Sequence, residues 1–262
     1  MYLKCASLRM LHGARDRSYW SQFEYHSYVI GYSISNELRK LKIETDGTYD
    51  ALIVEVGSED VSLGYYDFPV VKLNLVVDIP FDFERYDKSD DMQRCRYYIE
   101  LLQQGLQEIS NFKTIPYAEI MRLANELADN GFVYTWSFKN VTLRDYNLKV
   151  KFINELSTND YTFKLQAFVG KDKIPVCEEI LARTKPDSVH FPYISKKIDV
   201  ENGQIIINCK TGEPFLYIDI KSLLDGCLVI EYAKSPFPND ERASEVFYSL
   251  QSVFRNNKNF EL

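Results

Sequence analysis

Strict alternation of apolar and polar residues is the clearest pattern along the chain, and it predicts β-strands. In Val71–Val77 the odd-numbered positions are apolar, while Lys72 and Asn74 point to the other side. The same period of two recurs in three later segments, residues 134–139, 146–152 and 161–167. Because a period of two with one polar face is typical of antiparallel strands that cover a core, these segments predict antiparallel sheets.

Turn-forming residues divide the other extended segments. Asn202-Gly203 separates residues 197–200 from 204–207 and predicts a tight hairpin, because both turn residues tolerate positive φ angles. A second turn at 210–213 leads into a strand at 215–220, and Gly226 precedes a last strand. Further strands are predicted at residues 27–33, 41–44, 51–56 and 227–232.

Helical periodicity predicts four helices. Ser89 is the expected cap of the first, whose apolar stripe consists of Cys95, Ile99, Leu102, Leu106 and Ile109. A second helix spans Pro116 to Asp129 and ends before Gly131. A third begins near Asn239 and is expected to bury Ala243, Val246, Phe247, Leu250, Val253 and Phe254. A short fourth helix is predicted at residues 176–183.

The order of these elements predicts an α+β fold. Mainly antiparallel β-sheets are expected, with a helix pair near the middle of the chain and a C-terminal helix packed on them. The helix pair separates two strand-rich parts, an acidic half at 1–131 and a neutral half at 132–262. A single domain of 262 residues stays open as the alternative.

Composition narrows the class of protein. Apolar residues make up 45% and charged residues 26% of the chain, which favours a globular protein over a disordered one. No apolar run approaches the roughly 18 residues that cross a bilayer, and the first residues contain no apolar core of a secretory signal. The five scattered cysteines predict buried free thiols rather than disulfides or a zinc site. We therefore expect a cytoplasmic protein without membrane contact.

Negative charge is concentrated in one stretch. The net charge of the chain is −7, but residues 44–91 contain 13 acids against Lys72, Arg85 and Lys88, a net charge of −10. Such a surface repels nucleic acid and anionic membranes and attracts basic partners, at rates that fall with ionic strength. The stretch therefore predicts a basic protein partner and no direct binding of nucleic acid.

Carboxylates and large aromatic rings are mixed within this stretch, and we expect them to form a protein-binding surface. Rings supply contact area that can be desolvated, while carboxylates steer and select a basic partner. The predicted partner-binding residues are Glu59, Asp60, Tyr65, Tyr66, Asp67, Asp82, Glu84, Tyr86 and Asp87. The alternative is that Phe68, Phe81 and Phe83 are core residues beside an acidic face that contacts only solvent.

A non-enzymatic protein-binding function fits this surface chemistry. An immunity or inhibitor protein that blocks a nucleic-acid-cleaving toxin is one such protein, because these toxins need positively charged clefts to bind phosphate. This interpretation assigns no catalytic residue, metal or cofactor. A subunit of a larger assembly, which would expose an extended apolar patch, is a further alternative.

One pattern near the C-terminus predicts an enzyme instead. Asp219 and Lys221 alternate outward from the apolar residues of the strand at 215–220, and Glu231 and Lys234 follow. Two carboxylates that hold Mg²⁺, with a lysine beside the attacking water, can cleave a phosphodiester. The pattern resembles the motif of restriction-endonuclease-like nucleases, in which an acid on one strand precedes Glu/Asp-x-Lys on the next. Here one additional residue separates Glu231 from Lys234, which turns the lysine to the opposite face of a strand.

Other catalytic patterns are absent from the sequence. The three histidines, His12, His26 and His190, lie in no spacing typical of a catalytic triad or a zinc site. None of the 11 glycines belongs to a sequence motif typical of a phosphate-binding loop.

Overall fold

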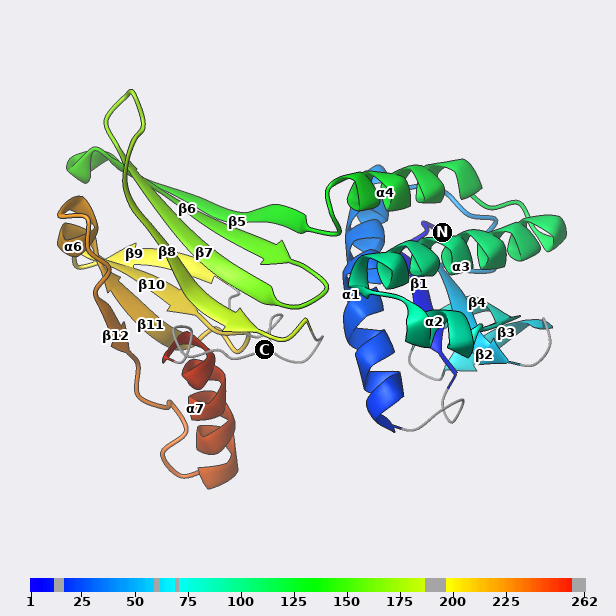
Figure 1. Ribbon diagram of the computed structural model, residues 1–262. Coiled ribbons are helices and arrows are strands. Elements are labelled where there is room, and N and C mark those ends of the chain that lie inside the picture. Colours follow the sequence, from blue (N-terminus) through cyan, green and yellow to red (C-terminus); the bar gives the residue numbers. More distant parts are fainter. Residues whose placement is uncertain (12–16, 59–61, 69–70, 187–196, 256–262) are drawn as a thin grey trace. The chain divides into compact units, whose positions relative to one another are not determined.

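The computed structural model describes residues 1–11, 17–58, 62–68, 71–186 and 197–255. Within it the chain forms two compact units, Met1–Tyr134 and Thr135–Leu262, which are described separately (Figure 1). The division lies close to the predicted one after residue 131; whether the units fold as separate domains stays a prediction. Helices and sheets occur in blocks, which confirms the α+β class.

The first unit is built on a four-stranded sheet. Its strands, in the order β1-β2-β4-β3, are β1 (Cys5–Met10), β2 (Ala51–Ser58), β4 (Val71–Pro80) and β3 (Ser62–Phe68). The pairs β1–β2 and β2–β4 are parallel, and only β3 pairs with β4 in the antiparallel direction. The expectation of antiparallel strands is therefore wrong for most of this sheet.

The predicted polar face of β4 is also wrong. Asn74 is only 4% exposed, and Leu75, Val76 and Val77 beside it are buried as well. Because consecutive residues of a strand point to opposite faces, both faces of β4 are covered at these positions.

Helix α1 (Arg17–Leu41) covers the free edge of β1. The Glu24 carboxylate accepts the Met10 N–H at 3.2 Å, and the Trp20 indole N–H donates to the Met10 carbonyl at 3.2 Å. Further along, the Ser35 hydroxyl accepts the N–H of Ala6 and donates to its carbonyl. These side chains satisfy backbone groups that an uncovered edge strand would expose. Residues 27–33 belong to α1, so the strand predicted there is wrong. The strand predicted at 41–44 is reduced to a single bridge between Glu44 and Tyr2.

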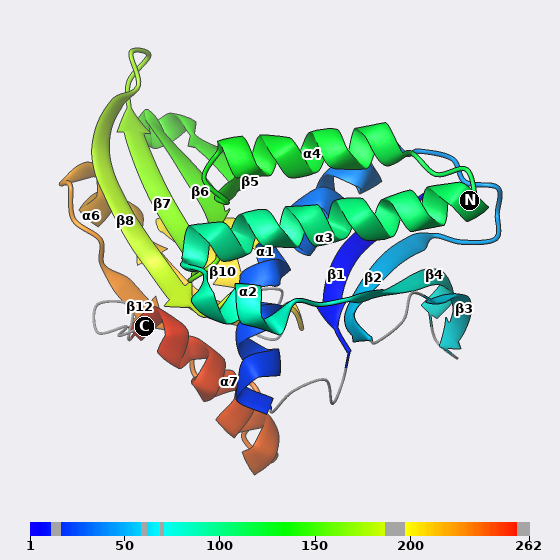
Figure 2. The same ribbon diagram turned by 45° about the vertical axis from the view of Figure 1, so that its right-hand side comes forward.

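Three helices follow the sheet: α2 (Phe83–Lys88), α3 (Asp91–Phe112) and α4 (Tyr117–Asp129). Figure 2 shows α3 and α4 running side by side. All five residues of the predicted stripe on α3 are buried, which confirms the helix, but its cap is Asp90 rather than Ser89. At Gly105, α3 lies so close to β2 that an added Cβ would be 2.5 Å from the Val54 side chain.

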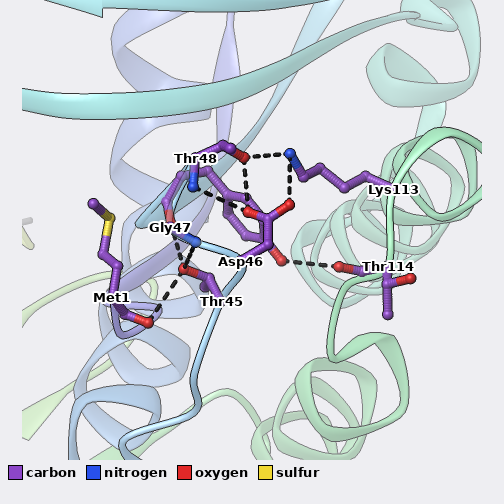
Figure 3. Close-up of polar contacts among 8 residues, drawn as sticks. Met1, Thr45, Asp46, Gly47, Thr48, Lys113 and Thr114 are labelled. Atoms are coloured by element: carbon purple, nitrogen blue, oxygen red, sulfur yellow. Dashed lines mark hydrogen bonds and ion pairs between the residues drawn. The ribbon is translucent and has the colours of Figure 1, made fainter.

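A polar turn joins α1 to β2 and is tied to the end of α3 (Figure 3). The Asp46 carboxylate accepts the N–H of Thr48 at 3.0 Å and its hydroxyl at 2.7 Å, and it pairs with the Lys113 ammonium at 2.9 Å. The Tyr49 hydroxyl donates to the Thr114 carbonyl. The contacts of Asp46 with Lys113 and Thr48 lower the pKa of its carboxyl group to about 2, and Lys113 is the largest cause.

The second unit contains two four-stranded sheets, which form two layers (Figure 1). The first consists of β5 (Tyr134–Leu143), β6 (Leu148–Leu156), β7 (Tyr161–Val169) and β8 (Ile174–Thr184). Both β6 and β8 pair with β7 in the antiparallel direction, and β6 buries every second residue as its alternation predicts. The helix predicted at 176–183 is wrong, because these residues belong to β8.

The second sheet is antiparallel throughout. Its strands are β9 (Lys197–Glu201), β10 (Gln204–Asn208), β11 (Pro214–Asp219) and β12 (Ile230–Tyr232). Asn202 and Gly203 have φ angles of 50° and 77°, as the predicted hairpin requires. A short helix, α6 (Ile220–Leu224), follows β11 directly, and the last strand begins at Ile230 rather than at residue 227.

Helix α7 (Glu241–Arg255) packs on this sheet through two phenylalanine rings. Phe247 and Phe254 are buried with their ring centroids 5.1 and 5.5 Å from that of Phe215. Val246, which was expected to be buried, is 55% exposed. None of the helices in the described ranges is long and apolar enough to cross a membrane.

Candidate functional site

Five exposed carboxylates lie in ten residues that follow β4 and end at the first residue of α3. This acidic segment, residues 82–91, contains Asp82, Glu84, Asp87, Asp90 and Asp91. Two of these side chains cap helices: Asp82 accepts the Arg85 N–H at 2.9 Å, and Asp90 accepts the Gln93 N–H at 2.8 Å. The Gln93 side chain accepts the Asp90 N–H in return, which completes a capping box. The caps fix the direction of both carboxylates.

A cluster of buried rings holds the acidic segment in place. The Phe81 ring centroid lies 5.4 Å from those of Tyr86 and Tyr97, and the Tyr97 hydroxyl accepts the N–H of Asp82. Tyr86 is completely buried, so it cannot offer its ring to a partner. The prediction of Tyr86 as a partner-binding residue is therefore wrong, because its ring and hydroxyl are both used inside the unit. Phe81, 8% exposed, is a core residue, as the alternative to a binding surface expected.

Basic side chains partly neutralise the acidic segment. Glu84 pairs with Lys88 at 2.5 Å, and Asp91 lies 3.6 Å from Arg94. Arg85 pairs with Glu100 outside the segment at 2.6 Å. With five acids and two bases, residues 82–91 keep a net charge of −3. Two acids of the wider stretch are also paired, Asp46 with Lys113 and Asp50 with Lys4.

Of the other predicted partner-binding residues, three can be placed, and they lie away from this segment. Glu59 and Asp60 lie outside the described residues. Tyr65, Tyr66 and Asp67 belong to β3, which runs antiparallel to β4 and pairs Tyr66 with Asn74. Asn74 and Pro80, at the end of β4, are six residues apart, or roughly 20 Å at about 3.3 Å per residue. The sheet therefore places these three residues away from the end of β4 where the acidic segment begins.

A second polar group, which the sequence analysis missed, crosses the sheet of the first unit. Arg9 of β1, Glu55 of β2 and Asp78 of β4 are aligned by the parallel pairing, and Ser62 of β3 aligns with Asp78. These four residues form what we call the polar row. The row lies towards the carboxyl ends of the parallel strands, where ligands commonly bind in open parallel sheets.

Burial perturbs the acids at the polar row. It raises the pKa of Glu55, and the neighbouring Asp78 raises it further, whereas Arg9 lowers it. Burial also raises the pKa of Glu24, which reaches the row from α1. One Asp78 oxygen accepts the Ser62 hydroxyl at 2.5 Å, and the other is buried with no hydrogen-bond partner among the described residues. Three carboxylates and one guanidinium in this part of the unit favour a positively charged group over an anion.

The residues of the predicted nuclease site have different roles in the second unit. The Asp219 carboxylate accepts the Ser222 N–H at 2.7 Å and caps α6, and Lys221 lies on that helix rather than on a strand. Glu231 aligns with Tyr217 rather than with Asp219. Glu231 and Lys234 are both exposed. In the part of the chain that the structure describes, no three His, Cys, Asp or Glu side chains are grouped to hold a metal ion.

The chain matches no protein-family model, no curated protein and no solved structure.

The histidines and cysteines add no reactive group to either site. His26 lies on α1, where burial lowers its pKa, and His12 and His190 lie outside the described residues. The five cysteines are free; Cys95, Cys177 and Cys209 are buried, Cys5 is half-buried and Cys227 is exposed. Burial raises the pKa of Cys95 to about 12, which keeps this thiol protonated and unreactive. The expectation that all five thiols are buried is wrong for Cys227.

Proposed function

We propose that this chain is a cytoplasmic, non-enzymatic protein that binds a basic protein partner through the acidic segment, residues 82–91. The observation that carries the proposal is the presentation of five exposed carboxylates on a backbone fixed by helix caps and buried rings. A rigid acidic surface loses little conformational entropy when it binds, and its charge steers a basic partner. Met92, 46% exposed directly after the segment, adds an apolar contact.

The polar row supports the same choice of partner. Glu24, Glu55 and Asp78 belong to the same unit as the acidic segment, and Arg9 offsets only part of their charge. A finer proposal is that the partner is a nucleic-acid-cleaving toxin, whose basic cleft the acidic segment would occupy. On this proposal the chain is an immunity or inhibitor protein.

The test compares two variants that change the net charge equally. The first, Glu84→Gln/Asp87→Asn/Asp91→Asn, neutralises three acids of the segment and leaves the capping residues Asp82 and Asp90 in place. The control, Asp145→Asn/Asp172→Asn/Glu201→Gln, neutralises three exposed acids of the second unit. Proteins captured from lysate of the native cell by the wild type and both variants are identified by mass spectrometry and then titrated in purified form.

The proposal predicts a basic protein that the wild type and the control capture and that the segment variant loses. Its affinity should fall on the order of tenfold in the segment variant and should fall steeply for the wild type as salt rises to physiological strength. Equal affinity for all three proteins would overturn the proposal, as would an affinity independent of salt. A captured protein that is acidic, or metal-dependent cleavage of nucleic acid by the purified chain, would also contradict it.

A further inference from the structure

Two cysteines of the second unit, Cys177 and Cys227, belong to chain segments that are in contact. Cys177 lies on β8 and is 7% exposed, whereas Cys227 lies just after α6 and is exposed. Val176 and Gly226, which precede the two cysteines, meet directly: a Cβ added at Gly226 would lie 3.2 Å from the Val176 carbonyl oxygen. Both thiols are free. Each of the two segments therefore carries a thiol next to their point of contact.

The end of α6 fixes the backbone at Cys227. The Gly226 N–H donates to the Leu223 carbonyl at 3.2 Å, and the Cys227 N–H donates to the Ser222 carbonyl at 2.8 Å. These two bonds form a Schellman motif, and Gly226 has the positive φ angle, 76°, that this motif favours. The absence of a side chain at Gly226 also allows its close approach to Val176. The contact with β8 is therefore built into the way this helix ends.

The pairing of β8 fixes the position of Cys177. It places Cys177 opposite Ala167 of β7, and both residues are buried. Burial raises the pKa of the Cys177 thiol, and Glu179 and Cys227 raise it further, so the Cys227 sulfur lies close enough to act on it. Cys177 therefore stays a protonated, covered thiol, whereas Cys227 is open to solvent and can meet an oxidant first.

We propose that Cys177 and Cys227 form a reversible disulfide when a small disulfide, such as glutathione disulfide, oxidises the chain. The Cys227 thiolate attacks one sulfur of glutathione disulfide, so that a mixed disulfide forms and one glutathione leaves. Cys177 then loses its proton to water and attacks the Cys227 sulfur, and the second glutathione leaves. Each departing thiolate takes up a proton. Two protein thiols are oxidised, and one glutathione disulfide is reduced to two glutathiones.

The bond is a redox-sensitive link between β8 and the end of α6. It closes a loop of the chain that contains β9, β10 and β11, so it restricts the unfolded chain and stabilises the second unit. The link is open in a reducing compartment and closes when glutathione disulfide accumulates. The proposal does not depend on the proposed partner binding, because both cysteines belong to the second unit and the acidic segment belongs to the first.

The experiment equilibrates the full chain at ratios of glutathione to glutathione disulfide that run from reducing to oxidising. Alkylation followed by peptide mass spectrometry then assigns the state of each thiol. Cys227→Ala removes the thiol that reacts first, and Cys177→Ala removes the one that reacts second. Cys209→Ala changes another buried cysteine of the same unit and is the control. Urea denaturation of the oxidised and the reduced chain measures the effect on stability.

We expect the oxidised wild type to contain one disulfide that joins the peptides of Cys177 and Cys227, opens on reduction and raises the urea midpoint. In the reduced chain, Cys227 should be alkylated at least about tenfold faster than Cys177. Cys177→Ala should stop at the mixed disulfide, Cys227→Ala should leave Cys177 reduced, and the control should form the same bond as the wild type.

Three results on the wild type would overturn the proposal. These are a chain that stays reduced, a chain that stops at the mixed disulfide of Cys227, and a disulfide that joins either cysteine to a different thiol. Because each result is obtained on the wild type, the test decides even where a variant does not fold.

Discussion

The hydroxyl groups of Tyr86 and Tyr98 lie 2.8 Å apart and are hydrogen bonded to each other inside the first unit. Both side chains are completely buried, and burial raises the pKa of both phenols. Tyr86 comes from α2 and Tyr98 from α3, so the bond joins the two helices that carry the acidic segment. A buried polar pair of this kind stabilises the unit only while both partners are present.

Tyr86→Phe should therefore destabilise the protein, because it leaves the Tyr98 hydroxyl buried without its partner. We expect a loss of about 1–3 kcal/mol in the free energy of unfolding, measured by urea denaturation. Tyr86→Phe/Tyr98→Phe should cost less than the two single changes together, since it removes both polar groups. Additive losses in this double-mutant cycle would contradict the coupling.

Gly105→Ala should destabilise the contact between α3 and β2. The new Cβ would lie 2.5 and 2.6 Å from the two methyl groups of Val54, which is itself fully buried. We expect a loss of about 1–3 kcal/mol, although alanine is the better helix former. Gln104→Ala, at an exposed position of the same helix, is the control and should change stability little. Rescue of Gly105→Ala by Val54→Ala would identify Val54 as the obstacle, and no rescue would count against this account.

The sequence pattern predicts correctly those elements that bury one face and leave the other in contact with solvent. The strand β6 and the buried stripe of α3 both follow their expected periods. Helix α1 was missed because Tyr28, Val29 and Ile30 favour strands locally. Its buried positions do follow a helical spacing, but three of them are small polar residues, Ser27, Ser33 and Ser35, which hydropathy does not mark as core.

Strand β8 was mistaken for a helix because bulges interrupt its alternation. The pairing with β7 shifts register between Phe163 and Lys164 and again between Ala167 and Phe168. Each shift turns the following residues of β8 to the other face, so no period of two remains.

The polar row could not be predicted for a different reason. Its residues come from separate strands and meet only through parallel pairing, which a single sequence does not reveal.

Asp46 should titrate well below an ordinary aspartate. Its pKa in the folded protein is about 2, because Lys113 and Thr48 stabilise the carboxylate, whereas an unfolded aspartate has a pKa of about 3.9. A folded pKa below the unfolded one means that the stabilisation is present above about pH 4 and is lost as the pH falls through about 2. The stability difference between wild type and Asp46→Asn should therefore shrink over that interval.

Carboxyl chemical shifts measured by NMR check the Asp46 titration directly. Lys113→Met should move the midpoint of Asp46 upward towards its ordinary value, because it removes the largest cause of the shift. Lys40→Met, which removes an exposed charge on α1, is the matched control and should leave the midpoint unchanged. A wild-type midpoint near 3.9 would show that the pairing with Lys113 does not persist in solution.

Gln251→Leu should loosen α7 from its sheet. The change keeps the size of the side chain but removes the donor to the carbonyls of Phe215 and Ala233, which then lie buried without this partner. We expect a loss of about 1–3 kcal/mol in the free energy of unfolding, whereas Ser249→Ala on the exposed side of α7 should cost little. Hydrogen exchange locates the effect: amide protection should fall in α7 and β11 of the variant and stay unchanged in the first unit. Equal loss of protection in both units would mean that Gln251 stabilises the whole chain rather than the attachment of this helix.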